Sequence, residues 1–431
     1  MHRASSAVQL YLQSSSRLVF NVLHFELYKL RSTIELYMGL FSHSRKEPHI
    51  ALLIDIGSGS VGASLVSYSY TKDGVQEKPV ILYSLRKVFP LTESVSYDQL
   101  ISVIRKTLRE ILGTIHDVKL GLPDKVYAVL SAPWYVSQAR TILYNKKPAF
   151  TVTEKFVNEL VKKEIDFFKE SVAPQIEGDA YVIENTIQSL VLNGYSLKEP
   201  IGKKAEEMKI SLFVSLSPRQ IIDAIHEEVE KIYRLKEIQF SSSGACSFVA
   251  LRDAFPNEES AMIISVGAEV TDVVLVREHI LSNAFTFPKG THSVYRTIAS
   301  SLSLDVSEAR TRALLCENGH ASLEMNRTLS PLLLGARNEW TETFSKTLAT
   351  FVNDLSIPHT VFVIAPDELA CWYKDTLLNE PFHQYTLTEK DFNVILVGSE
   401  TLHEYVVLKE GVTPDSCMSL QSLFIRRYLE N

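Results

Sequence analysis

Residues 50–60 read Ile50-Ala-Leu-Leu-Ile-Asp-Ile56-Gly57-Ser58-Gly59-Ser60. The apolar run predicts a buried β-strand, and the small residues after it, followed by the β-rich segment 61–70, predict a hairpin. Glycine and serine at such a turn let backbone amides approach a ligand closely, which phosphate binding requires. An ordinary tight hairpin carries the same residues, so this segment alone leaves both interpretations open.

A second strand, small-residue turn and strand follows about 210 residues later, because the apolar run 261–265 leads into Val266-Gly267-Ala268-Glu269 and then into the β-rich segment 270–276. Two similar hairpins that face each other across a cleft can grip one phosphate chain from both sides. This weak internal repeat therefore predicts a duplicated architecture with a cleft between its halves.

Further helices and strands are predicted from periodicity and turn residues. Helices are expected at 98–116, 153–170 and 218–231, and strands at 126–130, 180–192, 208–217 and 361–364. The dipeptide Asn193-Gly194 is typical of a hairpin turn. Strands alternating with covering helices predict an α/β fold, in which residues 119–217 form a compact inserted α+β unit.

Composition excludes several classes of protein. The chain of 431 residues has 45% hydrophobic residues and a formal net charge of −7, so it is globular and a poor candidate for binding nucleic acid. Cys246, Cys316, Cys371 and Cys417 form no CxxC pair, which favours a reducing, cytoplasmic setting. No uncharged apolar run is long enough to span a membrane.

The N-terminal segment 20–37 places apolar residues at alternating spacings of three and four, which predicts an amphipathic helix. It could pair with another helix or lie on a bilayer. A third interpretation is that residues 1–37 belong to an over-extended gene model, because Met38 precedes a polar stretch and then the first strand.

The two hairpins resemble the phosphate loops of the actin-like ATPase superfamily, the first at 55–62 and the second at 265–272. Within it the chain is similar to the bacterial cell-division protein FtsA and the pilus-assembly protein PilM. That likeness is carried by Glu199-Pro200-Ile201-Gly202 with the strand 208–214, by Phe287-Pro288-Lys289-Gly290, and by 306–309. It covers residues 48–431 in order.

The resemblance implies an actin-like, ribonuclease-H-like fold with two lobes and an inserted SHS2-type subdomain. The expected domains are an N-terminal extension (1–47), the first lobe (48–118 and 218–256), the inserted subdomain (119–217), and the second lobe with a terminal helix (257–431). It also implies an ATP and Mg²⁺ site, with Asp55 as the metal residue. The implied nucleotide-binding residues are Asp55, Gly57, Ser58, Gly59, Ser60, Gly267, Asp272 and Gly290.

Departures from the superfamily pattern bear on this chemistry. Ser265, Ala268, Glu269 and Val270 stand where nucleotide-hydrolysing relatives have an aspartate and a glycine-rich turn with threonine. Glu269 is expected to point toward the phosphate oxygens, and two negative charges about 4 Å apart repel by roughly 1 kcal/mol even in water. Ala365-Pro366 replaces the paired glycines of the adenine-side loop, which adds a side chain and removes an amide donor.

Two interpretations of the cleft follow. Either it binds ATP with weak or slow hydrolysis, or it is vestigial and the fold serves as a scaffold, which the departures favour. Asp272 could serve the cleft or be an ordinary solvated or capping carboxylate. His279 and His292 lie near the second loop without a Cys or acid at ligand spacing, so ordinary surface or core roles are expected for them.

The end of the chain, 419–430, places apolar side chains on one side of a helix beside Arg426 and Arg427. FtsA carries a membrane helix at this point, but here core packing is favoured because no long linker precedes the helix. The expected function is an FtsA-like scaffold in cell division at the cytoplasmic membrane face. The alternatives are a PilM-like role in type IV pilus assembly and a genuine ATPase. Division or pilus proteins are the expected partners, with self-association through the inserted subdomain.

Overall fold

The fold is taken from a computed structural model that describes residues 49–71, 75–90, 96–351, 357–380, 382 and 391–426. The predicted N-terminal helix at 20–37, and the question of a start at Met38, lie outside the described residues. By its internal contacts the described chain divides into two compact units, of which the smaller consists of residues 138–175 and 184–214. The larger unit contains the remaining described residues.

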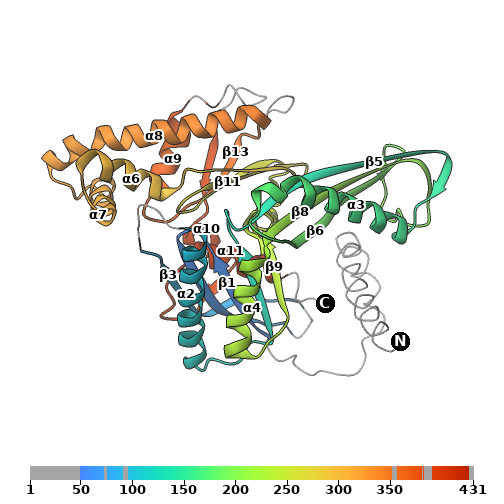
Figure 1. The fold of residues 1–431 in the computed structure, drawn as a ribbon, viewed down its shortest axis with the longest axis horizontal. Helices are drawn as coiled ribbons and strands as arrows, with labels where there is room; N and C mark the ends of the chain where they lie inside the picture. The colour runs from blue at the N-terminus through green and yellow to red at the C-terminus, as the bar shows by residue number, and fades with distance from the viewer. Residues whose placement is uncertain are drawn as a thin grey trace. The chain divides into compact units, whose positions relative to one another are not determined.

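A six-stranded sheet forms the first lobe of the larger unit (Figure 1). Its strands are β15 (Val407–Leu408), β3 (Val80–Val88), β2 (Ser60–Tyr68), β1 (His49–Ile56), β4 (Lys125–Leu130) and β9 (Ile238–Ser242), in that spatial order. β2 runs antiparallel to both β1 and β3, whereas β4 runs parallel to β1 and to β9.

A five-stranded sheet forms the second lobe and repeats this arrangement. Its strands are β12 (Ile280–Phe287), β11 (Thr271–Arg277), β10 (Ala261–Val266), β13 (Thr360–Ile364) and β14 (Asn393–Leu396), in that spatial order. β11 is antiparallel to β10 and β12, and β13 is parallel to β10 and β14. The sequence repeat therefore corresponds to two sheets that share the order and direction of five strands, and β15 adds a sixth strand to the first sheet.

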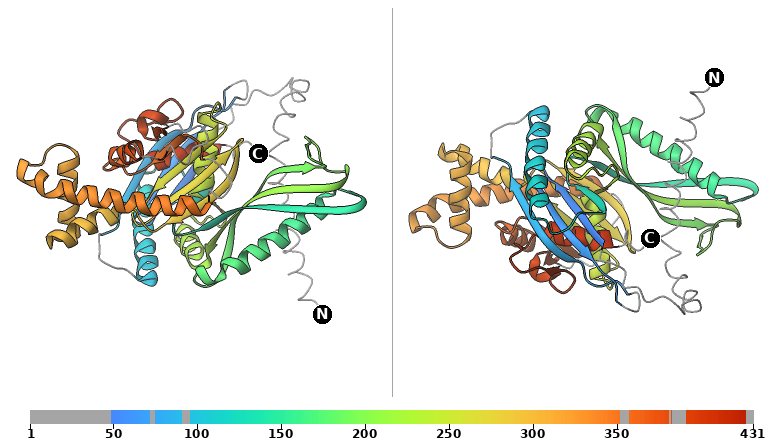
Figure 2. Two further views of the ribbon diagram at one scale, coloured as in Figure 1. Left: turned by 90° about the horizontal axis from the view of Figure 1, so that it is seen from above. Right: turned by 90° about the horizontal axis from the view of Figure 1, so that it is seen from below.

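Helices pack on both lobes (Figures 1 and 2). They are α2 (Tyr97–Asp117), α4 (Arg219–Tyr233), α5 (Ser243–Ala254), α6 (Thr291–Leu302), α7 (Val306–Glu317), α8 (Leu323–Phe351), α9 (Ala370–Asn379), α10 (Ser399–Leu402) and α11 (Ser416–Arg426). α2 and α4 lie side by side against the first sheet, and α5 contacts strands of both sheets. α8 and α9 contact the second sheet.

The two faces of β1 have different neighbours because successive side chains of a strand point to opposite sides. Leu52, Ile54 and Ile56 are fully buried in the cluster that includes the apolar side chains of α2 and α4. Asp55 faces the opposite way, toward α11, where Gln421 contacts it. A carboxylate is therefore buried at the end of the strand, next to the first turn.

The smaller unit is built on a four-stranded sheet. The sheet has the order β5 (Val136–Thr151), β8 (Lys204–Pro218), β6 (Ala180–Leu192) and β7 (Tyr195–Ser196). Three of its strands, β5, β6 and β8, have residues in the larger unit as well. α3 (Glu154–Val172) buries one apolar face and is followed by the short η2 (Ala173–Gln175). The hairpin at Asn193-Gly194 is present, with Leu192 opposite Tyr195. The predicted unit at 119–217 also included β4, which instead pairs with β1 because its apolar side chains complete the first sheet.

Burial explains the role of the C-terminal helix. Residues 418–425 of α11 are all buried, which confirms the predicted core packing of this helix over 416–426. The end of the predicted helix, 427–430, lies outside the described residues. Across the described ranges, no helix combines the length and the apolar character needed to cross a membrane.

Candidate functional site

The first turn connects β1 to β2 through Gly57, Ser58 and Gly59. It is closed by a hydrogen bond from the Gly57 amide to the Ser60 carbonyl, at 2.9 Å. From the loop after β4, the Trp134 indole Nε1 donates to the Gly57 carbonyl, also at 2.9 Å. The predicted residues 57–60 therefore form one short and well-supported turn.

The second turn, between β10 and β11, has the same construction. The Gly267 amide donates to the Val270 carbonyl at 2.9 Å, as Gly57 does to Ser60. Gly290 precedes α6, and the first amides of that helix donate to the turn: Thr291 to the Gly267 carbonyl at 3.0 Å and His292 to the Ala268 carbonyl at 2.8 Å. The first backbone amides of α6 are thus hydrogen-bonded to carbonyl groups of the second turn.

The two turns are in direct contact. The Ser58 hydroxyl oxygen accepts hydrogen bonds from the backbone amides of Ala268 and Glu269, both at 3.1 Å. A Cβ placed on Gly59 would lie 2.3 Å from the Ala268 Cβ, so only glycine fits there. The prediction that the hairpins face each other is confirmed, but no space for a phosphate chain separates them.

Asp55, the predicted metal residue, has both carboxylate oxygens engaged by the protein. Arg86 Nη1 lies 2.8 Å from one oxygen, and Gln421 Nε2 donates to the other at 2.7 Å. The Asp55 side chain is 4% exposed. A hydrated Mg²⁺ needs these oxygens and room for its waters. With the turns also in contact, the residues do not fit MgATP.

Glu269 does not point into an open phosphate site. It accepts hydrogen bonds from Arg296 Nη1 and Nη2, both at 2.7 Å, and its oxygen lies 2.9 Å from His292 Nδ1. Burial raises the pKa of Glu269, but Arg296 and His292 outweigh it and lower the pKa to about 2. The expected repulsion is thus cancelled by α6, and His292 has an acidic partner that its sequence neighbourhood does not reveal.

Asp272 is buried rather than solvated. Its carboxylate accepts a hydrogen bond from the Tyr135 hydroxyl and another from Thr286 Oγ1 at 2.8 Å. The Gly244 amide, at the start of α5, donates to the same Tyr135 oxygen at 3.3 Å. Burial raises the pKa of Asp272, although the hydrogen bonds from Tyr135 and Thr286 oppose the shift. Tyr135 therefore links the loop after β4 to β11, and Asp272 serves that contact.

The loop after β13 is also tied to its surroundings. Glu368, just beyond Ala365-Pro366, accepts a hydrogen bond from the Tyr295 hydroxyl at 2.6 Å and forms an ion pair with Arg310. Burial raises the pKa of Glu368, but the opposing effect of Arg310 and Tyr295 is larger, so the net shift is downward. This loop is joined to α6 by Tyr295 and to α7 by Arg310.

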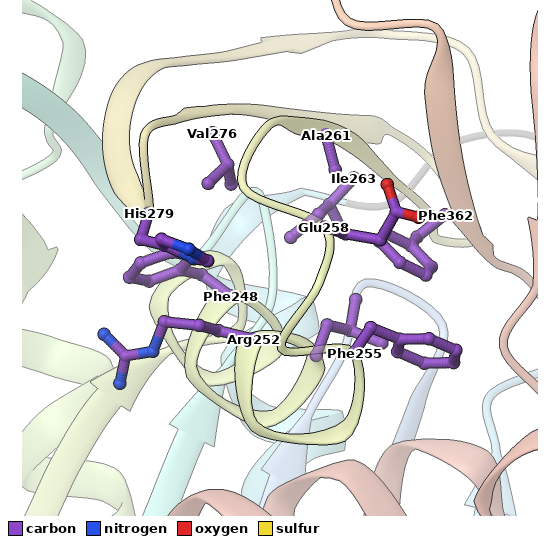
Figure 3. Close-up of a pocket in the computed structure, with 10 residues that line it drawn as sticks. Phe248, Arg252, Phe255, Glu258, Ala261, Ile263, Val276, His279 and Phe362 are labelled. Atoms are coloured by element: carbon purple, nitrogen blue, oxygen red, sulfur yellow. The ribbon is translucent and has the colours of Figure 1, made fainter.

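A hollow of the larger unit lies elsewhere, where α5 meets β10, β13 and the turn after β11 (Figure 3). Phe248, Phe255 and Phe362 line it together with Arg252 and His279. Its volume is about 10 Å³, close to the lower limit of about 10–15 Å³ that one water molecule requires. It is too small for a nucleotide or a peptide side chain.

Replacing Asp272 with asparagine is expected to change the pH dependence of stability. In the unfolded chain an aspartate loses its proton near pH ~3.9, whereas the folded protein holds this proton to higher pH. The folded state therefore binds more protons in that interval, and wild-type stability falls as the pH rises through it. The variant has no such proton, so its stability relative to wild type should rise as the pH increases above about 4. Urea unfolding at several pH values measures this, and identical pH profiles would contradict it.

Sequence reasoning missed the partners rather than the turns. Arg86, Gln421, Tyr135 and Arg296 were not among the predicted site residues, although each contacts one or more acidic groups of the cleft. Their separations along the chain are large, up to 366 residues for Gln421 and Asp55. Gly62 was the available signal, because a side chain there would collide with Arg86 and Met418.

No family model and no curated protein sequence matches this chain. Among solved structures, a chain of the PilM-PilN type IV pilus biogenesis complex is similar with a TM-score of 0.54 and 16% identity, over 87% of this chain and 98% of that one. The ethanolamine utilization protein EutJ from Carboxydothermus hydrogenoformans has a TM-score of 0.37 and 11% identity, over 94% and 97%. Component A of the (R)-2-hydroxyglutaryl-CoA dehydratase of Acidaminococcus fermentans has 0.34 and 11%, over 89% and 100%.

The fold predicted from the two hairpins is confirmed. The repeated sheet topology and the likeness to the chain of the PilM-PilN complex show the actin-like ATPase fold. At 16% identity, this likeness concerns the fold.

Proposed function

We propose that this chain is an actin-fold scaffold that recruits protein partners of the pilus-assembly kind at the cytoplasmic face of the membrane. The observation that carries the proposal is the likeness to a chain of the PilM-PilN type IV pilus biogenesis complex, which extends over 98% of that chain. That complex pairs the similar fold with a second protein. The same kind of partnership is the function proposed here.

The geometry of the cleft favours a scaffold over an ATPase. An ATPase must position phosphate, metal and water, and electrostatic stabilisation there depends on donors aimed at the developing charge. Here the amides of Ala268 and Glu269 bind the Ser58 hydroxyl, and the Asp55 carboxylate binds Arg86. A function that depends on binding partners needs none of these groups to be free.

A cell-division scaffold of the FtsA kind is the second candidate. It is favoured by one sequence feature, the segment Glu199-Pro200-Ile201-Gly202 before β8, which resembles FtsA more than PilM. Self-association through the smaller unit and peripheral contact with the membrane belong to both candidates. The two differ in the identity of the partner, which can be measured.

Affinity capture of the full chain from its native cells tests the proposal. Capture is carried out with MgATP and again after the nucleotide has been removed with apyrase, with an unrelated bait that carries the same tag as control. We expect a membrane-anchored pilus-assembly protein to be recovered equally in both conditions. Recovery that requires MgATP would contradict nucleotide independence, and division proteins in place of pilus proteins would favour the second candidate.

A further inference from the structure

Arg86 lies at the centre of a buried network of charges beside the first turn. Its Nη1 is 2.8 Å from Asp55 Oδ2 and donates to the Ser60 hydroxyl at 3.0 Å. Its Nε and Nη2 form a two-pronged contact with Asp415, at 2.7 and 3.2 Å. One guanidinium thus neutralises two carboxylates whose side chains are 4% and 15% exposed.

The sequence around Arg86 is adapted to this position. Arg86 is paired with Gly62 across β2 and β3. A Cβ on Gly62 would lie 2.9 Å from the Arg86 Cζ and 2.6 Å from the Met418 Cε. The absence of a side chain at residue 62 therefore lets the guanidinium lie over the strand and reach Asp55.

The positive charge of Arg86 between two aspartates favours this buried network. Burial by itself would lower the pKa of Arg86, but Asp55 and Asp415 together raise it well above the usual value. Burial also acts to raise the pKa of Asp415, whereas Arg86 lowers it, and the net shift is downward. Arg86 and Asp415 are thus both charged at neutral pH in a site that is mostly shielded from solvent. A planar guanidinium suits this task because its five donors match carboxylate oxygens in fixed directions.

At the second turn, a group of the protein lies where a phosphate loop would bind an anionic oxygen. In a phosphate loop, backbone amides at the turn receive an anionic oxygen. The corresponding amides of Ala268 and Glu269 receive the Ser58 hydroxyl from the other lobe. The lobes are joined again where Tyr135 contacts Asp272.

We propose that this protein carries built-in substitutes for the ligands of an actin-like cleft. The Arg86 guanidinium stands in for the metal cation at Asp55, and the Ser58 hydroxyl stands in for a phosphate oxygen at the second turn. The Ser58 contact, together with that between Tyr135 and Asp272, therefore holds the two lobes closed without nucleotide, while Arg86 neutralises Asp55 within the first lobe without a metal. This inference concerns the cleft alone and does not depend on which partner the scaffold binds.

Closure by the chain's own groups has a consequence for regulation. In a protein that closes around a ligand, the ligand must bind the closed state better than the open state. Here the contacts that favour closure are made by the chain itself, so changes in nucleotide level are not expected to change the state of the lobes. Any opening must come from a partner that breaks the contacts of Ser58 or Tyr135, which join the two lobes.

The experiment compares Arg86→Ala with Lys87→Ala, because Lys87 is the next residue of β3 and pairs with Glu110 at the exposed surface. Arg86→Ala leaves two buried carboxylates unpaired and should lower the unfolding temperature by about 5–10 °C. Lys87→Ala should change it by at most about 2 °C, because surface ion pairs contribute little. Added MgCl₂ should raise the unfolding temperature of Arg86→Ala and leave wild type unchanged. That rescue should be lost in Arg86→Ala combined with Asp55→Asn.

Wild type in millimolar MgATP provides an independent measurement, and its unfolding temperature should not change. A rise of the wild-type unfolding temperature in MgATP would overturn the proposal. Equal unfolding temperatures for the two single variants would also overturn it, as would an unfolding temperature of Arg86→Ala that does not change when MgCl₂ is added. If Arg86→Ala yields no folded protein, the proposal is tested instead with a variant that combines Arg86→Met with Asp55→Asn and Asp415→Asn. It should fold because no charge is left unpaired, and its failure to fold would also overturn the proposal.

Discussion

Replacing Gly59 with alanine is expected to lower the free energy of unfolding by about 3 kcal/mol, at the upper end of the cost of overpacking a closed interior. The added Cβ would stand 2.3 Å from the Ala268 Cβ and 3.3 Å from His292 Cε1. The new Cβ at residue 59 and the Ala268 Cβ are both attached directly to the backbone, so neither can move away by rotation about a side-chain bond. Relief requires the two turns to separate, which weakens the hydrogen bonds of Ser58 to the second turn.

A second substitution identifies the cause. Ala268→Gly removes the opposing methyl group, so Gly59→Ala with Ala268→Gly should recover most of the lost stability. The coupling free energy from the double-mutant cycle should be about 2 kcal/mol. Chemical denaturation of the four proteins measures it. Gly57→Ala is the matched control in the same turn, because its Cβ would meet only the Ser60 backbone oxygen, at 3.3 Å, and Ser60 atoms further away. A neutral Gly59→Ala would show that the turns are apart and that the cleft has room for phosphate.

Ending the chain at Asp415 is expected to prevent stable folding. Truncation removes α11, in which Met418, Leu420, Leu423, Phe424 and Ile425 are buried. At roughly 1.5–3 kcal/mol for each buried apolar side chain, the loss is about 8–15 kcal/mol, comparable to the entire stability of a typical protein. Asp55 would also lose the hydrogen bond from Gln421. Expression as soluble protein, circular dichroism and thermal unfolding measure the outcome.

A chain that ends at Arg426 is the matched control, since it keeps all of α11 and should fold. The comparison also separates core packing from membrane anchoring. An anchor helix could be removed without unfolding the rest, and the shortened protein would only fail to bind lipid vesicles. A folded, soluble chain ending at Asp415 would therefore refute the structural role assigned to α11.

Much of the fold could be predicted because its signals are local. The apolar runs that became β1 and β10, the small residues after each run, and the helical periodicity at 98–116 are all properties of short segments. The extent of the inserted unit was less predictable. The strand 126–130 has the same apolar character whether it joins the first sheet or the inserted one, and its pairing with β1 selects the former.

The candidate site was predictable only in part. Ser58, Gly59 and Gly267 lie where the two turns touch, whereas Asp55 lies just before the first turn and binds Arg86 and Gln421. The acidic residues Glu269 and Asp272 were singled out from the sequence, but their surroundings were not foreseen. Glu269 was expected to repel phosphate and instead binds Arg296, and Asp272 binds Tyr135.

By itself, the sequence of this protein determined that two hairpins of like construction end in turns fit for close backbone approach, since strand period and turn chemistry are encoded within a few residues. Only the tertiary structure decided what fills the space between those turns. Arg86 and Gln421 reach Asp55 from β3 and from the C-terminal helix, 31 and 366 residues away along the chain. Which side chain neutralises a buried charge depends on the packing of distant elements, because electrostatic and hydrogen-bonding partners are selected by proximity in space.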